Sequence, residues 1–577
     1  MEENGTPNTQ EFSGGEKPKK GMPIVISILF ILVLLCAGGL GVVNFFPEVI
    51  PAKMVYMLAE KQNIMQVQKQ IDGYMNDGFV KDALKVYNTP FKNDTTVTFK
   101  FKPETLQAPE AAQLKVINDI LSSSSLKINE SSDYKNEKTK AEYILNVKGI
   151  NLLNAEMFLD KKKLGFKIPA FYNKYIVVNG DDLAPVYEKF NKPVEMKKLV
   201  TNSDILKAIK FDKEEAFRLM NNYGEYLVKQ LNDKNFKFTK GVKLKTSEGD
   251  INCNQVALTL TMSEMKNISI KMLEKIQNDD KLLNLTAGNV LNVMKLYEDA
   301  GYYGTAGLPS EFKDINSIKN KIKQAIDEVK KDTTAESDKS EMVMTLLLDR
   351  KFNILERKIE AVSKGADSTV TGTVAFRLAG FSQPKSKGKE TIFEVQDTAA
   401  KTRFTIDAVE APKIKGELKT VVNIESGVNY GGTEEKPFTC KIDISDNSEK
   451  DKSKKVNAKF ESNIATYGTE KTIVSGAVTV DSTRDAAAGT VVSNVSVDTN
   501  VKSPTMSQQT GEIGVVLGIG SNMKFGEPVN LPSIDASNSL DINTASKDQI
   551  DQAMMEIQTA VQKLYLDSLK LLAPAGA

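Results

Sequence analysis

The hydrophobic pattern begins with one long apolar run near the start of the chain. No charged residue occurs from Gly21 through Pro47, and residues 22–46 form a stretch of 25 mostly apolar positions. As a helix that rises about 1.5 Å per residue, this stretch would be about 37 Å long. That length exceeds the roughly 30 Å hydrocarbon core of a bilayer. The pattern therefore predicts a membrane-spanning helix over 22–46.

Two other interpretations of this segment are a cleaved export signal and a lipoprotein signal that uses Cys36. An export signal has an apolar region of about 7–15 residues that ends at a small-residue cleavage site. Here the small residues lie inside the apolar run, which continues from Leu40 to Phe46, and Leu35 stands before Cys36, where lipidation would need a small residue. We therefore expect an uncleaved anchor.

The charges on either side of the segment predict its orientation. Lys17, Lys19 and Lys20 precede it, whereas Glu48 and Lys53 follow it. Because cytoplasmic flanks carry an excess of Lys and Arg, residues 1–21 are expected to form a short cytoplasmic tail. The rest of the chain would then lie outside the cytoplasm, as an extracellular domain held by a single membrane pass.

Beyond the anchor the apolar period changes repeatedly between that of helices and that of strands. Residues 53 to about 88 read as a long helical stretch, in which Ile64, Val67, Ile71 and Tyr74 are spaced like one helical face. Alternating runs joined by polar turns then predict antiparallel strands. The expected divisions are an α+β part with a β-meander at 47–262, a helical segment at 263–335, and a mainly antiparallel β part at 336–577.

The last predicted element is an amphipathic helix. Ser546 and Gln549 have the spacing of a capping box. Apolar residues follow at intervals of 4, 3, 4 and 3, namely Ile550, Met554, Ile557, Val561 and Leu564. A lone helix with such a stripe must bury it, so these five residues are the candidate groove-lining stripe, packed on a concave sheet face.

Taken together, the pattern predicts an α+β fold. An N-terminal transmembrane helix would precede a domain of large curved antiparallel β-sheet, with amphipathic helices packed on the concave face. The sequence leaves open whether there is one sheet or two, and it leaves the oligomeric state open.

Composition narrows the chemistry. The chain has 76 Lys and Arg against 75 Asp and Glu, a net charge of +1, which argues against a nucleic-acid surface. It contains no His, which excludes Ser-His-Asp and Cys-His catalysis and His-based zinc sites. We assign no catalytic, cofactor-binding or metal-binding residue and expect no enzyme.

Cys253 and Cys440 lie in strand-like runs and could form a disulfide or remain two buried thiols.

Three parts of the chain resemble a known group of proteins. They are the anchor, the meander Leu145–Val178 with "KIPAFYNKYIVVNGDDL", and the hairpin around Asp349. In this combination the chain resembles the LolA/LppX-like envelope proteins. It also resembles an uncharacterised family of single-pass membrane proteins from low-GC Gram-positive bacteria. The resemblance implies a curved half-barrel whose cavity, beneath plug helices, binds lipids or lipidated proteins.

These observations lead to one expected function and two alternatives. We expect a membrane-anchored extracytoplasmic protein that binds a lipid, another apolar molecule or an envelope ligand between sheet and helices, without catalysis. The first alternative is a structural or protein-interaction module with no ligand cavity. The remote alternative is an envelope hydrolase that uses two carboxylates.

Overall fold

The computed structural model describes residues 51–102, 118–194, 196–210, 212–246, 249–303, 313–331, 339–364, 369–382, 389–411, 414, 416–430, 433–465, 471–503 and 512–572. The predicted tail at 1–21, the predicted membrane helix at 22–46 and Cys36 lie outside the described residues. Among the helices that the structure does describe, none combines the length and apolar character needed to cross a membrane.

Twenty strands form one sheet in the described part of the chain. Their bounds are β1 (Phe91–Lys102), β2 (Ser125–Asp133), β3 (Lys138–Val147), β4 (Ile150–Asp160), β5 (Lys163–Ile168), β6 (Tyr172–Asn179), β7 (Phe236–Thr246), β8 (Gly249–Thr261), β9 (Glu341–Leu348), β10 (Ile354–Lys364), β11 (Val370–Ser382), β12 (Lys389–Asp397), β13 (Thr402–Glu410), β14 (Leu418–Tyr430), β15 (Thr433–Asp446), β16 (Ser453–Ala465), β17 (Lys471–Asp485), β18 (Thr490–Lys502), β19 (Glu512–Phe525) and β20 (Ser539–Asp541).

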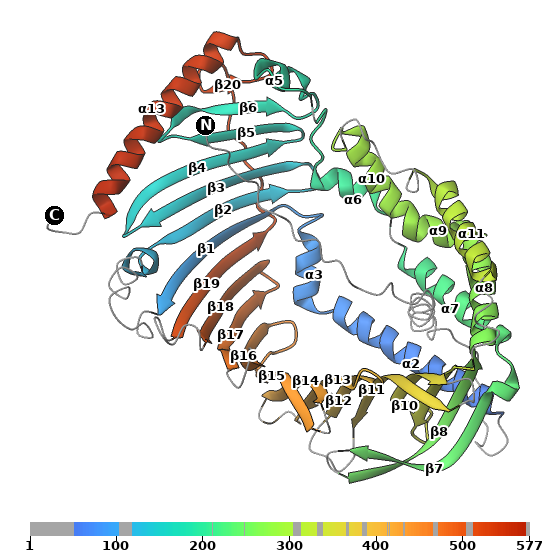
Figure 1. The fold of residues 1–577 in the computed structure, drawn as a ribbon. Coiled ribbons are helices and arrows are strands. Elements are labelled where there is room, and N and C mark those ends of the chain that lie inside the picture. The colour runs from blue at the N-terminus through green and yellow to red at the C-terminus, as the bar shows by residue number, and fades with distance from the viewer. Residues whose placement is uncertain are drawn as a thin grey trace, which may run out of the picture.

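The strand pairings run in one series from β7 to β19, continue through β1 to β6, and end at β20. Every pair is antiparallel except β6 with β20. The sheet is strongly curved and does not close on itself (Figure 1). The predicted curved antiparallel sheet is therefore confirmed, and it is one sheet rather than two.

Two long-range pairings make the sheet continuous. β8 pairs with β9 across the whole helical segment between them, and β1 pairs with β19 along its full length. In the second pairing Phe91 lies opposite Phe525 and Lys102 lies opposite Gly514. The two predicted β-rich parts of the chain are thus joined edge to edge.

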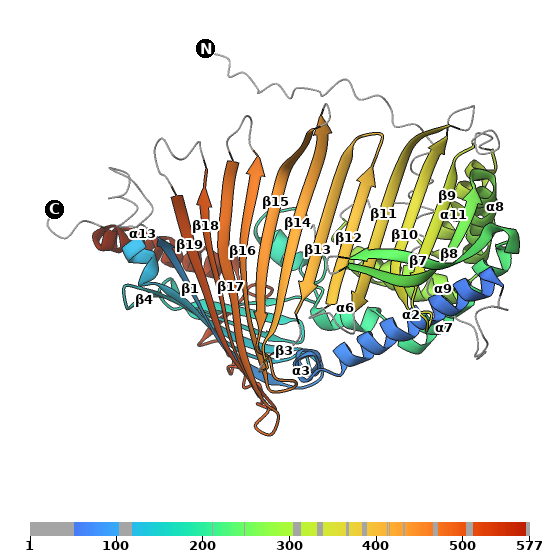
Figure 2. The same cartoon turned by 90° about the horizontal axis from the view of Figure 1, so that it is seen from below.

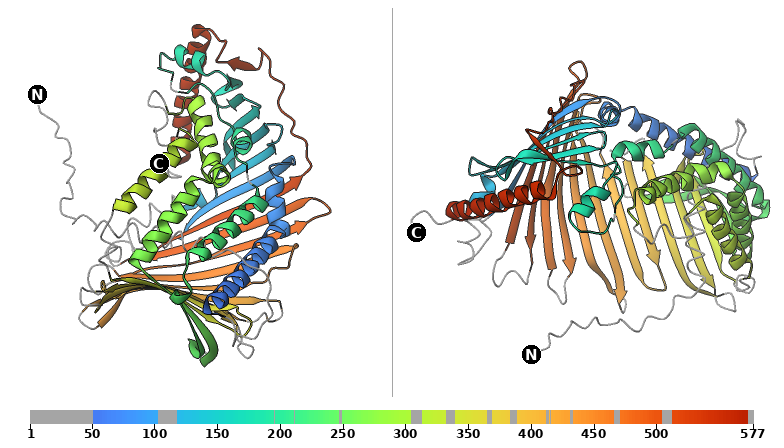
Figure 3. Two further views of the ribbon diagram at one scale, coloured as in Figure 1. Left: turned by 90° about the vertical axis from the view of Figure 1, so that its right-hand side faces the viewer. Right: turned by 90° about the horizontal axis from the view of Figure 1, so that it is seen from above.

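The helices are α2 (Ala52–Met75), α3 (Gly78–Lys85), α5 (Ala184–Lys189), α6 (Asn202–Ala208), α7 (Lys213–Gln230), α8 (Met262–Gln277), α9 (Asp280–Leu283), α10 (Asn289–Asp299), α11 (Ile315–Lys331) and α13 (Lys547–Leu572), with a 3-10 turn η2 (Asp233–Asn235) and a π-helical turn η3 (Asn284–Gly288). They lie on the side toward which the sheet curves, and α6 to α11 form an arc between its two ends (Figures 1 and 3).

The helical stretch predicted over 53 to about 88 is divided into two helices. α2 ends at Met75, and α3 begins at Gly78. The break occurs at Asp77, whose side chain accepts a hydrogen bond from the backbone N–H of Phe79 at 3.0 Å. An aspartate that caps a new helix in this way competes with continuation of the old one.

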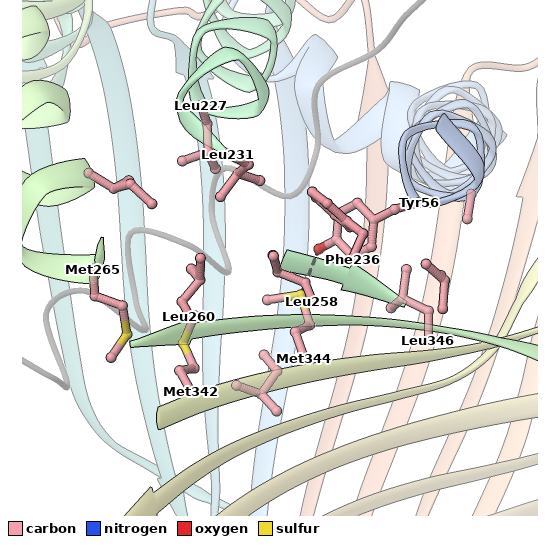
Figure 4. Close-up of a cluster of buried hydrophobic side chains, with 14 of the residues drawn as sticks. Tyr56, Leu227, Leu231, Phe236, Leu258, Leu260, Met265, Met342, Met344 and Leu346 are labelled. Carbon is pink, nitrogen blue, oxygen red and sulfur yellow. Dashed lines mark hydrogen bonds between the residues drawn. The ribbon is translucent and has the colours of Figure 1, made fainter. Parts of the chain in front are cut away.

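The main hydrophobic core lies at the β7–β11 end of the sheet. Side chains from α2, α7 and α8 pack there on β7 to β10 (Figure 4). Leu258, Leu346 and Met344 are at most 1% exposed. A second, smaller core lies at the opposite end, where α13 and the chain just before it pack on β6. The sheet is thus held by packing at its two ends.

Candidate functional site

The concave face of the central strands is apolar and only partly covered. Strand alternation places apolar side chains on this face and polar ones on the other. On β16, Val456, Ala458 and Phe460 are partly exposed on the concave side, whereas Lys455 and Lys459 are exposed on the convex side. We call the inward-facing positions of β12 to β19 and β1 the concave apolar face.

The register aligns these positions across neighbouring strands. One row runs through directly paired residues of eight adjacent strands, β16 to β19 and β1 to β4, and each residue in it is partly exposed. The row is Val456, Val480, Val495, Ile519, Val97, Leu126, Leu145 and Leu153. A second row joins β11 to β15 through Leu378, Phe393, Ile406, Ile424 and Cys440.

This face differs from the ends of the sheet in how well it is covered. Among the described residues between Lys389 and Phe525, no hydrophobic side chain is fully buried. At the β8–β9 end, by contrast, Leu260 and Met342 are 1% and 2% exposed. The central strands have the same alternation of apolar and polar residues as the strands at the ends. Their inward side chains are therefore partly exposed because no layer of helices, among those that the structure describes, packs over them.

Charged groups occur at the ends of these strands rather than in the middle of the concave face. Arg484 at the end of β17 pairs with Asp82 of α3, and Lys454 at the end of β16 pairs with Asp77 at 2.9 Å. Burial alone would raise the pKa of Asp82, but hydrogen bonds from Arg484 and Lys85 outweigh it and hold the pKa below its usual range. These ion pairs fix α3 at one rim of the face.

Charged side chains occur on the convex face of neighbouring strands. An ion-pair series crosses β10 to β13, in which Arg377 contacts Glu356 at 2.6 Å and Glu394 at 3.5 Å, and Arg403 contacts Glu394 at 3.0 Å. The desolvation of Arg377 would lower its pKa, but its two carboxylate partners raise the pKa above the ordinary value. The two faces of one sheet thus have opposite character, which is typical of a sheet that keeps only one side in water.

Helix α2 contributes apolar side chains near this face. Its first half is anchored by Glu60, which receives two hydrogen bonds from Arg357 of β10 at 2.7 and 2.6 Å. Val67 and Ile71 follow Glu60 by seven and eleven residues, so they lie on the same side of the helix. Their side chains are nevertheless 43% and 41% exposed. The second half of α2 therefore carries an apolar stripe that no described element fully covers. Figure 2 shows α2 running along one rim of the sheet, past the ends of its strands.

The predicted C-terminal stripe is only partly buried. The capping box is confirmed, because Gln549 and Ser546 exchange hydrogen bonds at 2.9 and 3.2 Å. Ile550 is 5% exposed and packs near β6, and Ile557 and Leu564 are partly exposed. Met554 and Val561, however, are 54% and 44% exposed.

The physical reason is the helix position. α13 packs on β6, and its buried positions are Ile550 and Ala553, three residues apart, rather than Ile550 and Met554. The buried face of α13 therefore passes through the small residue Ala553 and not through Met554. α13 consequently covers one end of the sheet, and the central strands lie away from it (Figure 1).

The two cysteines do not pair. Both are free thiols, Cys253 buried on β8 and Cys440 partly exposed on β15. Six strands separate β8 from β15, a distance of about 34 Å at about 4.8 Å per strand, whereas bridged cysteines have Cα atoms less than about 7 Å apart. Cys253 instead packs with Leu244, Leu347 and Ala379, and this burial raises the pKa of its thiol.

A separate cleft of 1010 Å³ lies in the helical arc, among α6, α7, α10 and α11. Lys210, Lys281, Lys295 and Lys313 line it together with three acidic residues. The acids already have partners, since Glu215 binds Arg218 and Asp212 and Asp314 cap helices. The cleft lies outside the concave apolar face, and its lining lysines are exposed to solvent.

Sequence reasoning located the strands but did not single out the side chains of the concave apolar face. Their signal is the strict alternation in runs such as "KVNAKFESNI", which is visible in the sequence. Alternation shows that two faces differ, but it does not show which part of an apolar face a helix covers.

Comparison with known proteins adds no family to this description. The chain matches no model of a protein family, and a search of curated proteins likewise returns no match.

Proposed function

We propose that this chain is a membrane-anchored, non-enzymatic protein whose concave apolar face binds the acyl chains of lipids. The observation that carries the proposal is the contrast between a largely apolar face and its incomplete cover. Each partly exposed Val, Ile, Leu or Phe there gains about 25 cal/mol for each Å² removed from water. An apolar ligand would supply this burial, and no hydrogen-bonding group of the ligand would lose its partners in the process.

The proposal includes the likeness to LolA/LppX-like proteins. A curved antiparallel sheet with helices on the concave side supports that likeness at the level of architecture. The alternative of a structural module without a ligand site is less well supported. Such a module would be expected to bury the inward side chains of β12 to β19, which are partly exposed.

The test is photo-crosslinking in intact cells that express the full chain. A photoreactive phenylalanine analogue is placed at Ile406, which faces the concave side of β13, and in a second strain at the adjacent Thr405, which faces the convex side. We expect lipid adducts, identified by mass spectrometry, at Ile406 and none at Thr405. Adducts only with a partner protein at Ile406 would favour the interaction module, and equal lipid labelling at both positions would contradict a specific apolar site.

The membrane anchor at 22–46, with the N-terminus in the cytoplasm, is part of the same proposal. The support is the length and charge asymmetry of the segment. Protease added to intact spheroplasts should digest the folded domain of an N-inside protein. A domain that survives in intact spheroplasts and is digested only after lysis would reverse the orientation.

A further inference from the structure

The dimensions of the concave apolar face determine how much ligand is needed to cover it. The eight strands β12 to β19 are neighbours in the sheet, so at about 4.8 Å per spacing they span about 34 Å. The strands have 9 to 15 residues, which corresponds to about 30–50 Å along the strand direction. This part of the sheet therefore extends over an area of the order of 1,000 Å² or more.

No single extended apolar group fills such a surface. One acyl chain is about 15 Å long, half of the roughly 30 Å hydrocarbon core of a bilayer, and therefore spans about three strand spacings. A helix about 10 Å wide, such as one formed by the chain's own residues 22–46, would cover two or three strands. Either occupant alone would leave most of the face in contact with water.

The face also lacks any division into separate sites. The row from Val456 through Val480, Val495 and Ile519 to Val97 contains only β-branched apolar residues. Within these five strands no charged residue interrupts the row, and beyond Val456 the next paired residue is Asp446 at the end of β15. The second row, through Phe393, Ile406 and Ile424, continues the apolar surface across β12 to β14.

The chemistry of the face favours lipid over a protein partner. Protein interfaces of this size carry about one hydrogen bond per 100–200 Å². The side chains of the row from Val456 to Val97 offer no donor or acceptor, and the other inward positions add only scattered hydroxyl groups, such as those of Ser462 and Thr499. The backbone groups of these strands are paired in the ladder. Acyl chains need no hydrogen bonds and adapt to a concave surface.

We propose that the concave apolar face binds several acyl-chain lipids at the same time, side by side across the strands. This inference rests on the proposed lipid-binding function and adds the number and arrangement of the ligands. The lipids would form one continuous apolar layer between the sheet and the helices, rather than occupy one discrete pocket.

Lipid counting by native mass spectrometry of the full chain tests the inference. Phe404→Lys on β13 and Leu517→Lys on β19 place a charge at two inward positions six strand spacings apart, about 29 Å. Thr405→Lys and Val516→Lys are the matched convex-face controls on the same strands. Thermal unfolding of all four variants identifies any that fail to fold. The number of lipids counted on the wild-type protein does not depend on the variants.

We expect two or more lipids per wild-type chain and the same number in both controls. Each inward variant should carry about half as many, since each charge lies in a different half of the roughly 34 Å span, and the double variant should carry fewer still. At most one lipid per wild-type chain, or complete loss of lipid from either single variant, would overturn multiple binding while leaving a lipid site intact. Absence of lipid from the wild-type protein would contradict the proposed function itself.

Discussion

The buried pair between Glu60 of α2 and Arg357 of β10 allows a quantitative test of how α2 is held. Glu60 is 4% exposed, and the guanidinium donates to both carboxylate oxygens at 2.7 and 2.6 Å. Replacement of Glu60 by Gln keeps the shape of the side chain but removes its charge. Arg357 then stays in a low-dielectric environment without a counter-charge, which typically costs about 3–5 kcal/mol.

The size of the pair's own contribution can be separated from this cost. If both residues are replaced by Leu, neither charge is buried, and the change in stability should be small or favourable. Glu60→Gln should therefore be much less stable than the Glu60→Leu, Arg357→Leu double variant. Gln66→Ala serves as the control, because Gln66 makes one exposed hydrogen bond from the same helix to Asn353, and loss of that bond should cost no more than about 0.5 kcal/mol.

Urea unfolding gives the overall loss of stability, and hydrogen exchange of the α2 amides reports the helix locally. A loss of about 3 kcal/mol corresponds to an increase of roughly two orders of magnitude in the opening equilibrium. If Glu60→Gln changes stability by less than about 1 kcal/mol, or if the double Leu variant is equally unstable, the attribution to an uncompensated buried charge is wrong.

The remaining predictions concern packing, pH and thiol reactivity. Leu258→Ala in the packed core should cost about 3–5 kcal/mol in urea unfolding, whereas Leu517→Ala on the concave apolar face should cost less than about 2 kcal/mol because its side chain is already partly in water; equal losses would contradict the contrast in cover. The pKa of Asp82 is lower in the folded protein than its ordinary value of 3.8, so its stabilisation of α3 is complete above about pH 4 and is lost as the pH falls through the folded pKa. Faster exchange of the α3 amides should appear in that acid range, and an Asp82→Asn variant should lack this pH dependence. Cys440 should react with a thiol reagent faster than Cys253, whose pKa is raised by burial; peptide mapping that finds the reverse order would contradict the assigned burial.

The regular elements could be predicted because their signals are local. A period of two in "TTVTFKFK" and in "KVNAKFESNI" specifies a strand with two unlike faces, and the structure has β1 and β16 there. The capping box of Ser546 and Gln549 likewise depends on residues three positions apart. Each of these signals involves neighbours in the chain, whose geometry is the same in any fold.

Which helix covers which part of the sheet could not be predicted. The stripe from Ile550 to Leu564 is amphipathic by sequence, yet only its first turns reach β6, and Met554 is exposed. The stripe of α2 shows the same division, since Ile64 is buried and Ile71 is 41% exposed. A helix buries only those apolar residues that meet another element, and its axis is set by contacts outside the helix.

By itself, therefore, the sequence determined the elements, the polarity of the two faces of each strand, and the absence of histidine-based chemistry. Only the tertiary structure decided that β1 lies beside β19 and that twenty strands form one unclosed curved sheet. It also decided that the helices pack at the ends of that sheet and leave the central concave face partly exposed. These outcomes depend on pairings between residues about four hundred positions apart, such as Phe91 with Phe525, and no local pattern records which distant partner a strand edge or an apolar face will meet.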